Sequence, residues 1–304
     1  MKATSSPVLP AAIEVEERAS MFSVWMELFK ARLSGLVVLT TLAGFYVAYQ
    51  GTMDWVLLFH SVCGTTLLAF GAAALNQLIE QEHDARMSRT ETRPLPSKRL
   101  TPGTVLWVGV LVSVLGFAQL YIWTNPLTAL LGALTSVSYL LVYTPLKRVT
   151  SLNTAIGAIP GALPPLMGWT AARGHLSVEG WGLFAILFFW QLPHFMAIAW
   201  MYREEYRKAG FAMLAVEDEG GHRTAVQAFS HTLGLLPVSL SPFAFGLAGK
   251  TYFISALVLG IAFIYFALRF YRQVDRINAR RLFFASIIYL PLLLMMMVID
   301  KTKL

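Results

Sequence analysis

Residues 55–94 read WVLLFHSVCGTTLLAFGAAALNQLIEQEHDARMSRTETRP. The first part of this stretch, Trp55–Ile79, contains no Asp, Glu, Lys or Arg. As an α-helix with a rise of about 1.5 Å per residue, it is long enough to cross about 30 Å of hydrocarbon. From Glu80 onward, charged residues follow in quick succession. An apolar segment that turns abruptly polar is typical of a membrane helix that ends at a water-facing loop.

The composition of the whole chain agrees with a membrane protein. Of its 304 residues, 56% are hydrophobic and only 13% are charged, and the mean hydropathy is +0.59. Soluble domains carry about 25% charged residues, so this chain has too few to cover a water-facing surface. The composition therefore excludes a soluble globular enzyme and a disordered chain. Cys63 is the single cysteine, which excludes an intramolecular disulfide and any metal site built from several cysteines.

Eight further segments resemble Trp55–Ile79 in length and composition, so we expect nine spans. The other eight are Leu33–Tyr49, Val105–Trp123, Leu127–Tyr143, Asn153–Ala171, Trp181–Met201, Ala225–Leu247, Tyr252–Phe270 and Leu282–Ile299. Each span must satisfy its backbone hydrogen bonds without water, and the segments are too long and too rich in Leu, Ala and Gly for membrane strands, so each is predicted to be a helix. We expect an all-α, polytopic membrane protein with a short segment at residues 1–32 and one transmembrane domain at residues 33–304.

The basic residues predict how this chain lies in its membrane. The net charge is +7, and with nine spans and an inside N-terminus, 20 of the 24 Lys and Arg residues fall on the inside. The positive-inside rule therefore predicts a cytoplasmic N-terminus and does not favour nucleic acid as a partner. The first residues, with Glu14 among them, are unlike a secretory signal or a transit peptide. We expect a bacterial cytoplasmic (inner) membrane protein in which Glu14–Arg32 forms a short interfacial helix.

The longest inside loops carry the chemistry-bearing residues. Asn76, Glu80 and Asp84 are spaced four apart, so on a helix they share one stripe. Oxygen ligands of this kind suit Mg²⁺, which prefers a few carboxylates plus water and phosphate, and Arg89 and Arg93 follow with guanidinium groups that suit phosphate. The alternative is a solvated helix end with ordinary ion pairs. Because Asn76 lies within the apolar span, where a polar side chain needs a partner, the metal site is favoured.

Two further clusters lie on the same side of the membrane. Glu204 and Glu205 follow the span Trp181–Met201 and could complete a metal site, or could form a solvated turn beside the membrane. The carboxyl-terminal side of the fourth span carries Tyr143, Lys147 and Arg148, which could hold a diphosphate or could be a basic stop signal.

Polar residues inside the membrane are the last candidates. Gln191 and His194 lie within Trp181–Met201 beside Pro193, and polar groups at that depth are functional candidates, although a histidine can also be a hydrogen-bonded core residue. Gly157 and Gly161 form a GxxxG pair in a span interrupted by three prolines. This pair indicates close helix packing, a bent helix that lines a cavity, or both.

Several of these strings resemble a known family. NQLIEQEHDARMSRTETRPL at residues 76–95 resembles the first acidic motif of the UbiA-type intramembrane prenyltransferases. YTPLKR at residues 143–148, Asn153, GALPPLMGWTAARG at residues 161–174, WQLPHF at 190–195 and EEYRKAG at 204–210 are similar to the branch of that family that farnesylates haem. Two features depart from the family pattern: Glu80 stands where many members have Asp, and only Glu204 and Glu205 stand near the place of the usual second acidic motif.

The resemblance implies a fold, a reaction and a set of site residues. The helices are expected to surround a central cavity that opens to the cytoplasm. Farnesyl diphosphate is ionised with the help of Mg²⁺, a vinyl group of haem B attacks the allylic cation, and water quenches the new cation to give haem O. The implied catalytic residues are Asn76, Glu80, Asp84 and His194; the diphosphate is held by Arg89, Arg93, Tyr143, Lys147 and Arg148; the acceptor cavity contains Asn153, Gln191 and His194; and the metal ligands are Asn76, Glu80, Asp84, Glu204 and Glu205.

The same resemblance implies haem A synthase or a terminal-oxidase assembly as downstream partners, besides the lipid bilayer itself. Two other readings compete with haem farnesylation. One is prenyl transfer to an aromatic quinone precursor by the same fold. The other is an ion-coupled transporter, in which the acidic stripe would bind the coupling ion, but transporters place such sites near the bilayer midplane and carry internal repeats. A membrane scaffold would leave the acidic clusters unexplained.

Overall fold

The structure is a computed structural model that describes residues 20–302. All regular secondary structure in this range is helical. The elements are α1 (Met21–Leu28), α2 (Ala31–Ala48), α3 (Trp55–Asp84), α4 (Pro102–Trp123), α5 (Pro126–Val137), the π-helix η1 (Ser138–Tyr143), α6 (Thr144–Leu146), α7 (Asn153–Arg173), α8 (Val178–Met201), α9 (Arg203–Lys208), α10 (Leu214–Glu217), α11 (His222–Ala244), α12 (Lys250–Arg272) and α13 (Arg276–Ile299).

Several helix starts follow directly from the sequence. α4 begins at Pro102, and the hydroxyl of Thr101 caps it by accepting from the backbone N–H of Thr104. α5 repeats this arrangement with Pro126 and an Asn125 cap. Proline suits the first helical position because it lacks only an N–H that would have no partner there, and the capping oxygen satisfies one of the free donors.

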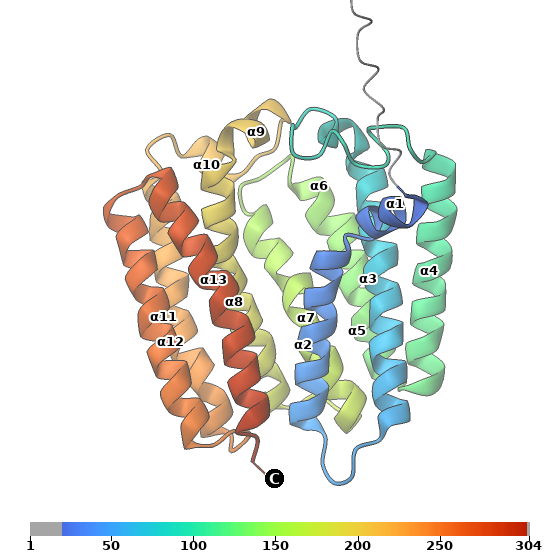
Figure 1. The fold of residues 1–304 in the computed structure, drawn as a ribbon, viewed down its shortest axis with the longest axis vertical. Helices are drawn as coiled ribbons and strands as arrows, with labels where there is room; N and C mark the ends of the chain where they lie inside the picture. Colours follow the sequence, from blue (N-terminus) through green and yellow to red (C-terminus); the bar gives the residue numbers. More distant parts are fainter. Residues whose placement is uncertain (1–19, 303–304) are drawn as a thin grey trace, which may run out of the picture.

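The expectation of an all-helical, multi-pass membrane protein is confirmed. Seven segments in the described range are long and apolar enough to cross a membrane: α2, α3, α4, the continuous segment Pro126–Leu146, α8, α12 and α13. α7 and α11 are of similar length and run alongside the seven in Figure 1. α7 packs inside the protein, with every residue from 162 to 171 buried. The count of nine spans stays a prediction.

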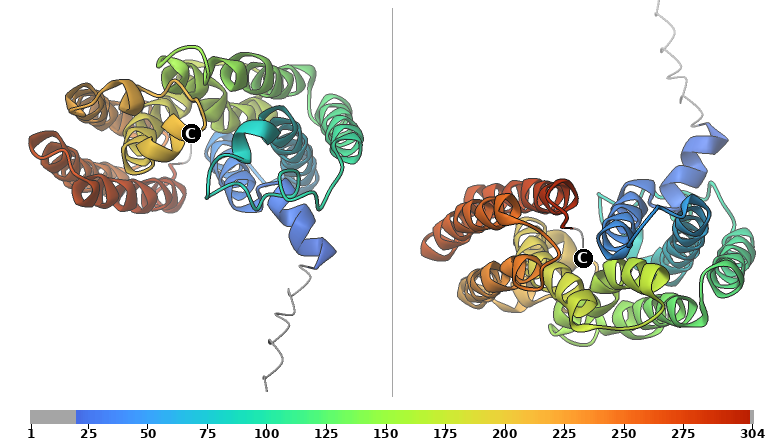
Figure 2. Two further views of the ribbon diagram at one scale, coloured as in Figure 1. Left: turned by 90° about the horizontal axis from the view of Figure 1, so that it is seen from above. Right: turned by 90° about the horizontal axis from the view of Figure 1, so that it is seen from below.

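The helices form two groups that lie side by side. Figure 2 shows α2–α7 in one group and α8, α11, α12 and α13 in the other, with their axes nearly parallel to one another. The short elements α1, α6, α9 and α10 and the loop that follows α3 gather at one end of the bundle (Figure 1). The two charged loops that the sequence places on one side of the membrane therefore share one end of the molecule.

The helix α1 lies across the ends of α2 and α3 (Figure 1), where apolar packing and hydrogen bonds hold it. Val24 and Leu28 of α1 are buried in an apolar cluster with residues of α3, the following loop and α4. The side-chain amide of Gln77 donates to the backbone carbonyls of Glu27 and Leu28 at 3.0 and 2.9 Å. Only part of the predicted interfacial helix Glu14–Arg32 is described, and residues 1–19 lie outside the described range.

The contact between α2 and α7 depends on two glycines. A β-carbon on Gly44 of α2 would lie 2.1 Å from the backbone oxygen of Pro165 in α7. In return, a β-carbon on Gly168 of α7 would lie 2.1 Å from the backbone oxygen of Thr41 in α2. Small residues at such an interface let two helix backbones approach closely, and this approach holds α7 in the middle of the bundle.

We expect Gly44→Ala to destabilise the protein by about 1–3 kcal/mol, because the added methyl meets backbone and cannot be accommodated by turning a side chain. The measurement is the unfolding midpoint in detergent, followed by tryptophan fluorescence. Gly35→Ala in the same helix is the matched control, because nothing lies within 4 Å of its added β-carbon. Equal midpoints for the two variants would contradict the packing described for α2 and α7.

Candidate active site

The last turns of α3 carry three buried polar side chains. Asn76, Glu80 and Asp84 are 0%, 3% and 1% exposed, respectively. All three belong to the one helix Trp55–Asp84 and recur every four residues, so they form a single stripe. The predicted stripe is therefore present, on the side of α3 that faces the protein.

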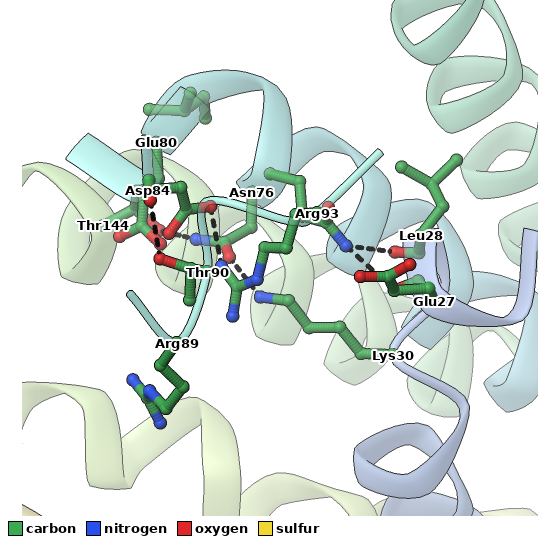
Figure 3. A network of polar contacts seen from close by, with 12 residues as sticks. Glu27, Leu28, Lys30, Asn76, Glu80, Asp84, Arg89, Thr90, Arg93 and Thr144 are labelled. Atoms are coloured by element: carbon green, nitrogen blue, oxygen red, sulfur yellow. Dashed lines mark hydrogen bonds and ion pairs between the residues drawn. The ribbon is translucent and has the colours of Figure 1, made fainter. Parts of the chain in front are cut away.

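Each of these side chains meets a basic group from a different segment. The Lys30 amine donates to Asn76 Oδ1 at 2.5 Å, the Lys147 amine to Glu80 Oε1 at 2.8 Å, and the Arg93 guanidinium to Asp84 Oδ2 at 2.6 Å. Figure 3 shows Lys30 and Arg93 both directed at the end of α3. A buried carboxylate is tolerated only when it is paired, and these partners supply the pairing.

The position of Lys30 is set by the backbone between α1 and α2. Its φ of 46° and ψ of 51° place it in the left-handed region, which a residue other than glycine rarely occupies and only at a cost. This conformation turns the chain sharply after α1, which Gln77 holds at its carboxyl end. The turn aims the Lys30 amine at Asn76, the neighbour of Gln77 on α3.

The orientation of Asn76 is fixed from its other side. The hydroxyl of Thr144 donates to the carbonyl of Tyr139 at 2.8 Å and accepts from the Asn76 amide nitrogen at 3.0 Å. Pro145 follows directly and has no backbone N–H to donate, and the helix widens to the π-helix Ser138–Tyr143 just before it. The amide oxygen of Asn76 therefore points away from Thr144, toward Lys30.

The charges in this cluster favour an anionic ligand. Loss of water around the amine, together with the nearby Arg93, lowers the pKa of Lys30 to about 7. Burial also opposes the charge of Lys147, but Tyr143 and Glu80 hold its pKa above the ordinary value. Three basic side chains thus face two carboxylates, and an incoming anion would relieve the repulsion among the cations.

The oxygen atoms of the stripe fit a magnesium ion. Glu80 and Asp84 each use one carboxylate oxygen in an ion pair, and the second oxygen of each accepts no hydrogen bond within residues 20–302. Across that range, no three His, Cys, Asp or Glu side chains come together as a metal cluster. Two carboxylates and an amide are a ligand set that leaves room for water and phosphate, as Mg²⁺ prefers.

A cavity of about 380 Å³ extends from this cluster into the bundle, within the size range of ligand pockets. Its charged lining comprises Lys30, Glu80, Asp84, Arg89, Arg93 and Lys147. Its deeper lining is mostly apolar and includes Leu68, Met167, Pro160, Pro164 and Trp190. One end of the cavity thus suits a multiply charged anion, and the other suits a hydrocarbon chain or a large apolar ring.

The GxxxG pair of α7 makes room for cavity side chains. A β-carbon on Gly157 would lie 2.4 Å from the ring of Tyr143, and one on Gly161 would lie 2.2 Å from the side-chain oxygen of Gln191. Tyr143 also receives the Lys147 amine over its ring at 4.6 Å, while Gln191 donates to the carbonyl of Ala158 at 2.7 Å. This helix therefore both packs closely and lines the cavity, and the bend that its prolines suggest stays a prediction.

Five residues expected in the site lie outside the cavity lining. One is Asn76, which is buried behind the lining with its amide bonded to Lys30 and Thr144; the other four lie farther away. Arg148 is exposed and donates to the carbonyl of Ile79 at 3.0 Å. Asn153 is buried and uses its amide nitrogen on the carbonyls of Thr150 and Ala212, so it ties a loop to α7. Glu204 is exposed and pairs with Arg203 and Arg207, while Glu205 accepts from the backbone N–H of Arg89 at 3.4 Å. None of these four positions faces the space where a substrate would lie.

Arg89 lies at the edge of the cavity and is turned toward α9. Its guanidinium lies 5.2 Å from the ring centre of Tyr202 and 5.8 Å from that of Tyr206. Sequence reasoning missed Lys30 and Tyr139, which line the cavity, and Ser286, which contacts the cavity residue His194 at 2.7 Å. No pattern in the sequence distinguishes Lys30 from the other basic residues, and Ser286 belongs to a helix with no recognisable motif.

The fold and this site define an intramembrane prenyltransferase. The model of the UbiA prenyltransferase family matches residues 37–288, and the chain belongs to this family. It is also 43% identical to the protoheme IX farnesyltransferase of Solibacter usitatus, over 91% of this chain and 98% of that protein. The family resemblance of the motifs around Asn76 is thereby confirmed.

Solved structures share the fold. A digeranylgeranylglyceryl phosphate synthase matches with a TM-score of 0.78 at 15% identity, over 92% of this chain and 98% of that chain. A UbiA homologue from Archaeoglobus fulgidus, solved with GPP and Mg²⁺ bound, matches with a TM-score of 0.65 at 13% identity, over 90% of this chain and 99% of that chain.

We expect Lys30→Met to lower kcat/KM for prenyl transfer roughly tenfold to a hundredfold, because a charge-assisted contact contributes about 1.5–3 kcal/mol. Lys98→Met is the matched control, since Lys98 also has a positive φ, of 58°, but is exposed. The measurement is steady-state kinetics in detergent with a prenyl diphosphate as the varied substrate. An equal, small loss of kcat/KM in both variants would show that Lys30 does not take part in the site.

Proposed function

We propose that this protein transfers a farnesyl group from farnesyl diphosphate to a vinyl group of haem B, with addition of water, to give haem O. The observation that carries the proposal is one cavity with a polar, cation-rich end and a mostly apolar body. Farnesyl diphosphate has the matching shape, with a charged head and a long apolar tail. The similarity to a protoheme IX farnesyltransferase along most of the chain supports haem as the acceptor.

The polar end supplies what departure of the diphosphate requires. Lys30, Arg93 and Lys147 lie at hydrogen-bonding distance from the acidic stripe, where they can turn from Asn76, Asp84 and Glu80 to diphosphate oxygens. Asn76, Glu80 and Asp84 would hold Mg²⁺, and the bound ion supplies positive charge that favours the departing anion. Positive groups already in place stabilise the charge that develops as the bond to the diphosphate breaks.

The apolar body of the cavity governs the rest of the reaction. The farnesyl carbon that loses the diphosphate forms a bond to the terminal carbon of the vinyl group, which leaves a cation on the vinyl carbon next to the porphyrin ring. The apolar lining around Leu68 and Met167 keeps bulk water away from both cations. A single water then adds its oxygen to the second cation, and its proton passes to a base. His194 is the candidate base, because it lines this cavity.

The proposal includes a direction in the membrane. The carboxyl end of α3, which supplies Glu80 and Asp84 to the cavity lining, lies with α1, α9 and α10 at one end of the bundle (Figure 1). We place this end at the cytoplasmic face of a bacterial inner membrane because the basic loops gather there. Farnesyl diphosphate is a water-facing anion and would enter from that side. Mg²⁺ and both substrates would then meet at the end of α3.

We expect purified protein to convert haem B and farnesyl diphosphate to haem O only when Mg²⁺ is present, with activity lost in EDTA and restored by added Mg²⁺. Asp84→Asn should remain folded and lose product formation, because the amide removes the charge that holds the ion. The measurement is chromatography and mass spectrometry of the haem product. Prenylation of a hydroxybenzoate instead of haem would show that haem is not the acceptor. Full turnover by Asp84→Asn would show that the acidic stripe does not bind the catalytic ion.

We expect Lys147→Met and Arg148→Met to differ, although the two residues are adjacent. Lys147 pairs with Glu80 inside the cavity, whereas Arg148 donates to a backbone carbonyl outside it. Lys147→Met should raise KM for farnesyl diphosphate roughly tenfold or more and leave KM for haem nearly unchanged, while Arg148→Met should change both little. Parallel changes in both variants would mean that these residues act through topology or folding.

A further inference from the structure

His194 is held between two aromatic rings from different helices. The ring of Trp190, one turn earlier on α8, lies 5.1 Å from the His194 ring, centre to centre, with 19° between the planes. The ring of Phe283 on α13 also stacks on the His194 ring, with 5.1 Å between the ring centres and 26° between the planes. Two stacked neighbours fix the plane of the imidazole, so its nitrogens can point only along that plane.

The side chain of Ser286 on α13 contacts one of the two ring nitrogens of His194. The Ser286 hydroxyl donates to the carbonyl of Phe283 at 2.6 Å, and His194 Nδ1 lies 2.7 Å from the same oxygen. A hydroxyl has one proton to donate. With that proton on the Phe283 carbonyl, the Ser286 oxygen is left as an acceptor, and this arrangement favours a hydrogen on His194 Nδ1.

The backbone of Ser286 strengthens the same contact. Trp190 Nε1 donates to the Ser286 carbonyl at 2.8 Å, so both residues that flank this turn of α8 bond to one residue of α13. Ser286 itself is fully buried, at 0% exposure. The bonds therefore fix the distance and the rotation between α8 and α13 at the level of the cavity.

The second nitrogen of His194 is left with its lone pair. Nε2 makes no hydrogen bond with any residue in the range 20–302, and His194 is part of the cavity lining. A neutral imidazole whose Nδ1 is protonated has an unprotonated Nε2 that can accept a hydrogen bond or a proton. The arrangement presents a base to the apolar part of the cavity.

We propose that Ser286 is a positioning residue that holds His194 as the Nδ1–H tautomer, so that Nε2 takes the proton of the water that adds to the prenylated haem. This proposal rests on the function proposed above. In that step the water oxygen bonds to the cationic carbon beside the porphyrin, one O–H bond of the water breaks, and its proton moves to Nε2. The proton later leaves His194 for solvent.

Loss of Ser286 should change the outcome of the step more than substrate binding. In Ser286→Ala, Nδ1 loses its acceptor, and the tautomer with the hydrogen on Nε2 becomes accessible. In that tautomer Nε2 already carries a hydrogen and can no longer accept the proton of the water. The cation can instead lose a proton from the neighbouring carbon, which gives an alkene in place of the alcohol.

The direct test is ¹⁵N NMR of protein labelled at histidine and reconstituted in nanodiscs, with the His194 signals assigned by their absence in His194→Gln. The wild type should show a protonated Nδ1 and an unprotonated Nε2, and Ser286→Ala should lose this preference. Ser239→Ala is the matched control, because Ser239 is a buried serine that bonds Tyr289 of α13 at 2.7 Å and does not line the cavity.

The second arm measures the ratio of alkene to alcohol among the haem products by mass spectrometry. Ser286→Ala should raise this ratio at least severalfold with haem affinity changed less than about twofold, while Ser239→Ala and Ser286→Thr, which keeps a hydroxyl, should resemble the wild type. A hydrogen on Nε2 in the wild type, or an unchanged tautomer and ratio in Ser286→Ala, overturns the proposal.

Two other outcomes are distinguishable from these. A haem Soret band that shifts in Ser286→Ala and in His194→Gln would place Nε2 at the iron and overturn its assignment to the water. A wild type that shows the expected tautomer but forms no prenylated haem from farnesyl diphosphate would overturn the proposed function and, with it, the water step. The control of the tautomer by Ser286 would still stand.

Discussion

Two carboxylates and an amide oxygen are buried at the end of α3, and a buried carboxylate that loses its partner costs several kcal/mol. The partners come from three places in the chain: the turn after α1, the loop after α3 and the end of α6. These contacts therefore bring distant segments to one point. They also explain why α1 is packed across the bundle, since Gln77 holds it where Lys30 can reach Asn76.

The same pairs prepare the cavity for its substrates. Without a ligand, the cations satisfy the acidic stripe; with a diphosphate and a magnesium ion, each could exchange one partner for another of opposite charge. Such preorganised groups need little rearrangement at the moment of reaction. Farther along the cavity, α7 supplies glycines where Tyr143 and Gln191 need space, and α13 supports the cavity residue His194 through Phe283 and Ser286. The two groups of helices thus contribute different parts of the chemistry.

The sequence predicts a large part of this arrangement. Apolar length identifies the helices, and the four-residue spacing of Asn76, Glu80 and Asp84 identifies the stripe, because both depend on local periodicity. The partners could not be predicted in the same way: Lys30 lies 46 residues from Asn76, and a left-handed turn directs it there. Arg148 and Asn153 match family motifs, yet their side chains bond backbone carbonyls outside the cavity. Which way a side chain faces at a helix end depends on tertiary contacts that spacing does not contain.

The central claim is that the paired acidic stripe serves farnesylation of haem. The most direct measurement is extraction of total haem from cells that express this protein, followed by reversed-phase chromatography, with Glu80→Gln expressed to the same level in the membrane for comparison. The account predicts a later-eluting, more hydrophobic haem in cells with the wild-type protein and only haem B in cells with Glu80→Gln. Haem B alone in cells with abundant, folded wild-type protein would contradict it.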